Sequence, residues 1–111
     1  MNLSQKHCVP CEGGVPPLKH VEIERFLPQV PSWQVLNGKK IVRNFKFNGF
    51  EEAVQFVNRV AKLAETENHH PDIHIFYNKV KLELATHAIH GLSENDFILG
   101  AKIDELHDTH R

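Results

Sequence analysis

Two segments of alternating hydrophobic and polar residues, separated by a long helical segment, constrain the fold of this chain more than any other feature. The first covers residues 33–47 and contains Asn37-Gly38, and the second covers residues 73–84 and contains Asn78-Lys79. A period of two is typical of strands that are buried on one face. Asn-Gly also favours a type I′ turn, because both central residues of that turn need positive φ. Each segment is therefore predicted to be a β-hairpin, with its turn at the named pair.

The segments before the first hairpin and after the second have the spacing of amphipathic helices. Residues 18–27 form a short helical segment that ends at Pro28, because proline lacks a backbone donor and restricts the residue before it. Ser93 is in position to cap a final helix, whose apolar residues continue to Leu106. The order α-β-β-α-β-β-α predicts an α+β fold, in which a four-stranded antiparallel sheet has three helices packed on one face.

The segment between the hairpins is predicted to be one helix from Asn48 to about Thr66. Asn48 and Glu51 have the spacing of a capping box. The apolar residues that recur at intervals of three and four define a stripe toward the core, made of Phe50, Ala53, Val54, Val57, Val60, Ala61 and Ala64. Phe56 and Leu63 lie off this stripe. They either widen the buried face or form a contact between helices of two subunits.

Length and charge exclude several classes of function. The 111 residues suit a single domain, expected at 18–111 after an irregular N-terminal arm at 1–17. The 13 Lys and Arg against 14 Asp and Glu leave no basic excess for a phosphate backbone, so no nucleic acid is expected as a ligand. No apolar run approaches the roughly 20 residues of a membrane helix, and the N-terminus lacks the apolar core of a signal peptide. We therefore expect a cytoplasmic protein that does not contact a membrane.

The N-terminal arm contains the only two cysteines, Cys8 and Cys11, in CxxC spacing. Two thiolates at this spacing supply half of a tetrahedral zinc site and need two further ligands. A redox dithiol is a second possibility, although such motifs usually open a helix, whereas Gly13 and Gly14 follow here. A pair of reduced thiols without chemistry of their own is the third. The sequence leaves all three open.

Three of the nine histidines are predicted to meet at one rim of the sheet. His69 and His70 lie between the long helix and a strand, and His87 follows the last strand. Pro71 favours an extended conformation at His70, so the two adjacent side chains should diverge. Because the pKa of histidine lies near physiological pH, such a group suits a reaction that needs both proton donation and proton removal. The spacing fits no usual zinc site, so no metal is expected there. The other histidines are expected at the surface.

Four stretches at their observed spacings, residues 65–71, 77–80, 86–87 and 91–96, resemble the pterin-4a-carbinolamine dehydratase family. The likeness extends over about residues 18–106, and the CxxC arm resembles bacterial members. The resemblance implies a hydro-lyase that converts 4a-hydroxytetrahydropterin to quinonoid dihydropterin and water without a cofactor. This reaction recycles the pterin of an aromatic amino acid hydroxylase. The resemblance further implies a homodimer or a homotetramer.

The resemblance also implies roles for individual residues. His69, His70 and His87 take the catalytic places, with His69 and His87 in acid and base roles and His70 mainly in substrate binding. Besides these histidines, substrate binding is implied for Pro71, Thr86, Ala88 and Ile89. Glu65 and Asp96 take acidic places, where a carboxylate either tunes or orients an imidazole or is a plain helix-terminal charge.

The sequence leaves two alternatives to an enzyme open. One is a protein-binding module of the same fold, a coactivator-like dimerisation partner that acts through the long helix. The other is a metal-binding protein that uses Cys8, Cys11 and the histidines. Turnover of a 4a-hydroxypterin separates the enzyme from the binding module, and stoichiometric metal after dialysis identifies the metal protein.

Overall fold

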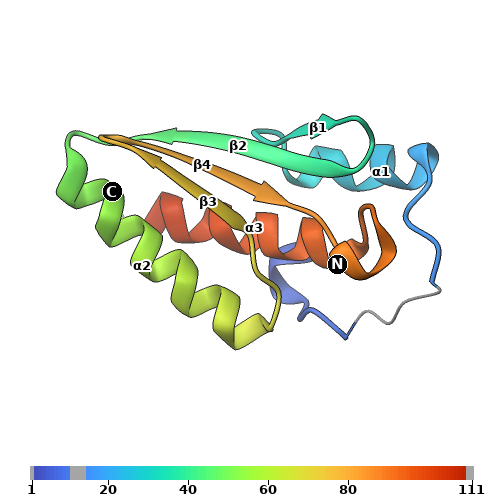
Figure 1. Cartoon of the computed structure of the whole chain (residues 1–111). Coiled ribbons are helices and arrows are strands. Elements are labelled where there is room, and N and C mark those ends of the chain that lie inside the picture. Colours follow the sequence, from blue (N-terminus) through green and yellow to red (C-terminus); the bar gives the residue numbers. More distant parts are fainter. Residues whose placement is uncertain (1, 11–14, 110–111) are drawn as a thin grey trace.

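The computed structural model of the chain describes residues 2–10 and 15–109. Its helices and strands follow the predicted order (Figure 1). The bounds are α1 His20–Phe26, β1 Gln34–Leu36, β2 Lys40–Lys46, α2 Phe50–Glu67, β3 Asp72–Phe76, β4 Lys79–Leu84 and α3 Glu94–Thr109. Three short 3-10 turns accompany them, η1 Leu3–Gln5, η2 Leu27–Gln29 and η3 His87–Ile89.

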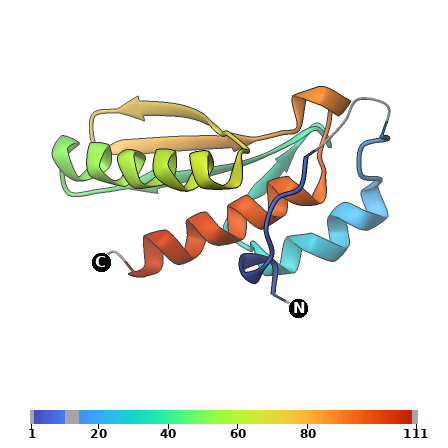
Figure 2. The same cartoon turned by 90° about the horizontal axis from the view of Figure 1, so that it is seen from below.

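The four strands form one antiparallel sheet in the order β1-β2-β4-β3. All three helices cover the same face of this sheet, with α3 between α1 and α2 (Figure 2). The predicted α+β fold is therefore confirmed. Asn37 and Gly38 lie in the turn of the first hairpin, as expected, and both have positive φ, at 55° and 66°. Leu36 pairs with Lys40, so Lys39 also belongs to the turn, which is one residue longer than the predicted pair.

The second hairpin turns one residue earlier than predicted. Phe76 pairs with Lys79, so Tyr77 and Asn78 form the turn, and Tyr77 has a φ of 55°. Asn78 is tied to the end of β2 at two points. Its side-chain amide donates to the Phe47 carbonyl at 3.1 Å, and its own carbonyl accepts the Phe47 N–H at 2.8 Å. These contacts with the end of β2 fix the register of the second hairpin, which the predicted turn at Asn78-Lys79 missed.

The predicted capping box at the start of α2 is wrong. The helix begins at Phe50, after Gly49, and the side chain that reaches back is that of Glu52 rather than Glu51. The Glu52 carboxylate accepts the backbone N–H of Asn48 at 2.9 Å. Glu51 and Glu52 are both exposed and either could have accepted the Asn48 N–H. Because α2 begins at Phe50, it is Glu52 that reaches it.

The face of α2 that packs on the sheet is rotated relative to the predicted stripe. Phe56 is fully buried, and its ring lies 4.8 Å from that of Phe45 and 5.1 Å from that of Phe47. Phe50, predicted to be in the core, is 54% exposed, and Leu63 is half-buried against the core. Phe56 and Leu63 therefore widen the buried face, and Phe56 is not available for a contact with another subunit.

The central helix, α3, is buried along much of its length, which its mixed sequence does not suggest. Phe97 stacks on Phe26 of α1 with ring centroids 5.4 Å apart. His107, expected at the surface, instead places its ring edge against Phe45 and Phe56. Across the described residues, no helix combines the length and the apolar character needed to cross a membrane. The predicted domain boundary and the cytoplasmic location stay predictions.

Candidate active site

The end of α2 positions the first two predicted histidines. Asn68 follows the helix in the left-handed conformation, with a φ of 53°, and its N–H bonds back to carbonyls of the last turn. The N–H of His69 also returns to the Ala64 carbonyl, at 3.2 Å. Asparagine tolerates this conformation better than other residues with a side chain. The chain leaves the helix here and enters β3 at Asp72, with both histidines at the junction.

The segment after β4 brings the third histidine to the same rim. Thr86 and Gly91 form an isolated antiparallel bridge, which closes a short loop around the turn that contains His87. A side chain at Gly91 would not fit, because a Cβ there would lie 2.6 Å from the Cβ of Pro17. The close approach of residues 17–18 thus holds the base of the loop.

A hollow of about 340 Å³ lies between these two junctions. Its lining residues are Val9, Pro10, Asn68, His69, His70, Ala85, Thr86, His87, Ala88 and Asn95. All three predicted catalytic histidines therefore meet there, together with the predicted binding residues Thr86 and Ala88. Pro71 and Ile89 are not among the described residues that line it, and Ile89 is buried instead.

Asp96, at the start of α3, is the anchor of this site. Its side chain is fully buried, and its Oδ1 lies 2.6 Å from Nε2 of His69. Its Oδ2 accepts the Thr86 hydroxyl at 2.8 Å and the Ser93 N–H at 3.0 Å. Because the single hydroxyl hydrogen of Thr86 is used in this way, the Ser93 hydroxyl must donate to Thr86 across their 2.7 Å contact.

The contact with Asp96 selects one tautomer of the neutral His69 ring. A carboxylate only accepts hydrogen bonds, so Nε2 of His69 must carry the hydrogen that points at Asp96. In the neutral ring the lone pair is then on Nδ1. The Nδ1 atom has no hydrogen-bond partner among residues 2–10 and 15–109. The contact with Asp96 thus prepares His69 to accept a proton at Nδ1.

His70 and His87 have much looser surroundings. Nε2 of His70 lies 2.5 Å from the Glu65 carboxylate, but both side chains are exposed. Exposed ion pairs hold their partners weakly because water screens them. His87 is exposed as well, and it also borders a second hollow of about 340 Å³ toward Lys39 and His90. Both rings are therefore placed to adjust to a ligand.

Sequence reasoning missed several residues of the hollow. Val9 and Pro10 come from the N-terminal arm, and Asn95 lies in the first turn of α3, but none of the three was predicted to line the site. Ser93 directly precedes α3, as predicted for a cap, and its hydroxyl also belongs to the hydrogen bonds around Asp96. The only sequence signal for these residues was their place within stretches of family resemblance or beside them.

The predicted metal alternatives find no support in the described part of the chain. No group of three or more His, Cys, Asp or Glu side chains is placed there to hold an ion. Cys11 lies outside the described residues, so the role of the CxxC pair stays a prediction. His110 lies outside them as well.

Comparisons of the sequence with known proteins agree on one family. A family model described as "Pterin 4 alpha carbinolamine dehydratase" matches residues 16–106. Relatives from Rubrobacter xylanophilus and Halorhodospira halophila, both named for this dehydratase, are each 50% identical to the chain. The matches cover 94% and 96% of this chain and 97% and 98% of those proteins.

Two solved structures have the same fold. A transcriptional coactivator/pterin dehydratase from Brucella melitensis superposes with a TM-score of 0.76 at 34% identity, over 81% of this chain and 97% of that one. A pterin dehydratase-like protein, described as a RuBisCO assembly factor in the alpha-carboxysome, gives a TM-score of 0.58 at 22% identity. That second match covers 68% of this chain and 88% of the other, and its likeness concerns the fold alone.

Proposed function

The chain belongs to the pterin 4 alpha carbinolamine dehydratase family of hydro-lyases, and we propose that it dehydrates 4a-hydroxytetrahydropterin by histidine acid/base catalysis. In this reaction the bond between C4a and its hydroxyl oxygen breaks, N5 loses its proton, and a double bond forms between C4a and N5. The products are quinonoid dihydropterin and water. The reaction needs one group that protonates the departing hydroxyl and one that takes the N5 proton.

The observation that carries the proposal is the contact between His69 and the buried Asp96. It leaves a lone pair on Nδ1 of His69, which suits His69 to take the N5 proton. It also stabilises the imidazolium that forms, because the carboxylate faces the opposite nitrogen at 2.6 Å. His87 lines the same hollow and serves as the acid for the leaving hydroxyl. His70 then binds and orients the ring, and its exposed contact with Glu65 lets it move toward the substrate.

The remaining binding residues follow from the same placement. Thr86 and Ala88 line the hollow where the ring edge would sit, whereas Pro71 and Ile89 are each next in sequence to a lining residue, His70 and Ala88. The hollow, at about 340 Å³, falls within the size range of small-ligand sites. No step of this mechanism requires a cofactor.

The test is the rate at which the purified protein removes a 4a-hydroxytetrahydropterin that a hydroxylase produces. We expect the double variant His69→Ala/His87→Ala to lose the catalysed rate, since each proton transfer contributes about 10²–10⁴-fold. His20→Ala is the matched control, because His20 is 86% exposed on α1, outside the hollow. A double variant that retains the wild-type rate would contradict the proposal.

Two further parts of the proposal concern partners. Quinonoid dihydropterin is the form that a reductase can accept, so we place the step in the recycling of an aromatic amino acid hydroxylase's pterin.

We also propose a homodimer or homotetramer, because β1 and β3 are open edges of the sheet and Phe76 and Tyr77 on the second hairpin are largely exposed. A monomeric mass at micromolar concentration would contradict the oligomer. The protein-binding alternative stays a prediction, without Phe56 as its contact.

A further inference from the structure

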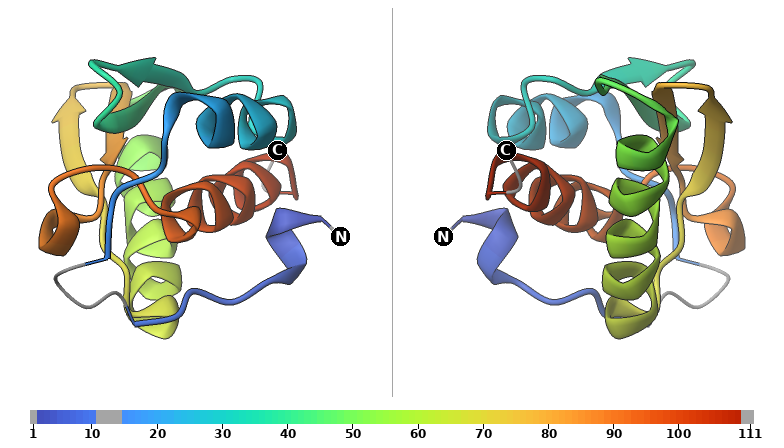
Figure 3. Two further views of the ribbon diagram at one scale, coloured as in Figure 1. Left: turned by 90° about the vertical axis from the view of Figure 1, so that its right-hand side faces the viewer. Right: turned by 90° about the vertical axis from the view of Figure 1, so that its left-hand side faces the viewer.

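The N-terminal arm is a fixed part of the molecule along residues 2–10. It runs from η1 across α3 to the C-terminal end of α2 (Figure 3). Leu3 is buried in the core, and its N–H donates to the side chain of Gln29 at 2.8 Å. Lys102 of α3 donates to the Ser4 carbonyl at 2.9 Å. None of these residues lines the hollow, and their contacts secure the start of the arm.

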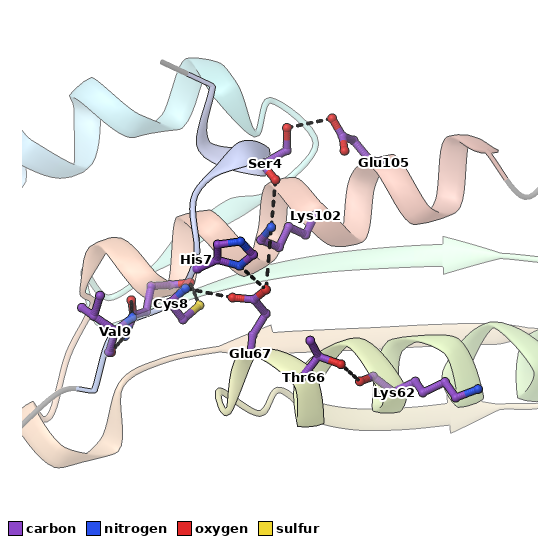
Figure 4. A network of polar contacts seen from close by, with 10 residues as sticks. Ser4, His7, Cys8, Val9, Lys62, Thr66, Glu67, Lys102 and Glu105 are labelled. Carbon is purple, nitrogen blue, oxygen red and sulfur yellow. Dashed lines mark hydrogen bonds and ion pairs between the residues drawn. The ribbon is translucent and has the colours of Figure 1, made fainter.

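Glu67, the last residue of α2, secures the middle of the arm (Figure 4). Its side chain is only 4% exposed. One carboxylate oxygen accepts the Cys8 N–H at 2.8 Å, and the other lies 3.0 Å from Nδ1 of His7 and 3.7 Å from the Lys102 ammonium. A buried carboxylate needs such partners, and here the arm supplies two of the three. Because Glu67 comes two residues before His69, the same end of α2 holds the arm and the histidine run.

Asn95, on the first turn of α3, secures the arm next to the hollow. Its Oδ1 accepts the Val9 N–H at 3.0 Å, and its Nδ2 donates to the Val9 carbonyl at 2.5 Å. This pair of hydrogen bonds resembles the pairing of two strands and leaves the Val9 backbone little freedom. The next residue is Asp96, which holds His69. Two consecutive residues of α3, Asn95 and Asp96, thus hold the arm and the His69 ring in a fixed relative position.

The arm places apolar surface where the hollow otherwise has little of it. Val9 is 65% exposed and lines the hollow with Pro10, and most of the other lining residues are histidines, asparagines and a threonine. A flat heterocycle with polar edges needs hydrogen-bonding groups at its edge and an apolar surface against its ring. Among the other lining residues, only Ala85 and Ala88 offer purely apolar side chains.

We propose that Val9 and Pro10 form the wall that packs against the pterin ring, and that Asn95 and Glu67 are positioning residues that hold this wall. This inference rests on the proposed function, since it assigns further binding residues to the same site. It predicts that the arm contributes to substrate affinity rather than to the proton transfers. Changes in the arm should therefore act on KM and leave kcat close to the wild-type value.

The test compares Val9→Gly with Val15→Gly in the complete chain. Both valines are exposed in the N-terminal region, at 65% and 56%, but only Val9 lines the hollow. We expect Val9→Gly to raise KM about threefold to tenfold, the loss expected for part of one apolar contact, with kcat within twofold. Val15→Gly should leave both constants unchanged, and the thermal midpoints of both variants should agree.

Asn95→Ala adds a second measurement, because it removes the two hydrogen bonds to the Val9 backbone. If Asn95 acts through Val9, the double variant Val9→Gly/Asn95→Ala should have a KM close to that of Asn95→Ala alone. Equal KM values for Val9→Gly and Val15→Gly, or effects on KM that multiply in the double variant, would overturn the inference. A wild-type protein without dehydratase activity would instead overturn the proposed function on which it rests.

Discussion

At the scale of single residues, the buried carboxylate of Asp96 is predicted to decide which nitrogen of His69 can take a proton. In Asp96→Asn, the amide oxygen can still accept from Thr86 and Ser93, so the amide NH₂ must face His69. Nε2 of His69 then becomes the acceptor and Nδ1 carries the hydrogen. We expect kcat to fall by about 10²-fold or more, with a smaller change in KM, measured by initial rates on the 4a-hydroxypterin.

Glu65→Gln is the matched control for this substitution. It makes the same chemical change at the carboxylate next to His70, but both of those side chains are exposed and weakly coupled. Its kcat should stay within a few-fold of wild type. Equal losses of kcat in Asp96→Asn and Glu65→Gln would mean that burial of Asp96 has no special role.

The sequence predicted which residues belong to the site, but not which of them are hydrogen-bonded to each other. His69 and Asp96 were assigned to one site because they match the family resemblance, and the structure places their side chains in contact. The spacing does not reveal which oxygen or nitrogen atoms meet, because Thr86 and Ser93 reach Asp96 only through the closed loop after β4. For Pro71 and Ile89 the family resemblance predicted substrate binding, but neither residue lines the hollow.

At the scale of elements, the orientation of α2 on the sheet is predicted to depend on Phe56. Phe56→Ala removes a fully buried ring that contacts Phe45 and Phe47, so we expect a loss of about 3–5 kcal/mol in the free energy of unfolding. Phe50→Ala is the control on the same helix, because Phe50 is 54% exposed. It should cost less than about 1 kcal/mol. Chemical denaturation of both variants measures the difference, and similar losses would contradict the observed orientation of α2.

The rotation of α2 shows why sequence patterns predict elements better than faces. The spacing of apolar residues identified the helix, but two overlapping stripes were available, one with Phe50 and one with Phe56. The choice depends on the aromatic rings that β2 presents, Phe45 and Phe47, which lie elsewhere in the sequence. The one-residue shift of the second turn has the same kind of cause, because Asn78 bonds to the end of β2.

At the scale of the whole molecule, the N-terminal arm contacts both the end of α2 and the first turn of α3, and so connects these two helices. The sequence suggested an irregular arm because it contains glycine, proline and no hydrophobic period. Its fixed position arises from single contacts at long range, such as Cys8 with Glu67 and Val9 with Asn95. Local patterns carry no information about contacts of this kind, so the arm's part in the hollow could not be predicted.

The attachment of the arm is predicted to weaken in acid through Glu67. Burial raises the pKa of this carboxyl, but the hydrogen bonds from Cys8 and His7 and the charge of Lys102 together outweigh burial and hold the pKa below its ordinary value of 4.5. A carboxyl with a lowered pKa in the folded state stabilises the fold above its ordinary pKa. That stabilisation is lost as the pH falls through the lower, folded value.

Glu67→Gln tests this dependence, because glutamine resembles the protonated acid at every pH. At pH 7 the variant should be less stable than wild type by about 1–3 kcal/mol, as expected for lost hydrogen bonds to a charged group. The difference should shrink as the pH falls below 4.5, where the wild-type carboxyl also becomes protonated. Denaturant unfolding of both proteins between pH 3 and 7 measures it, with Glu51→Gln as the exposed control on α2. A difference that stays constant, or that grows, as the pH falls below 4.5 would show that ionised Glu67 does not fasten the arm.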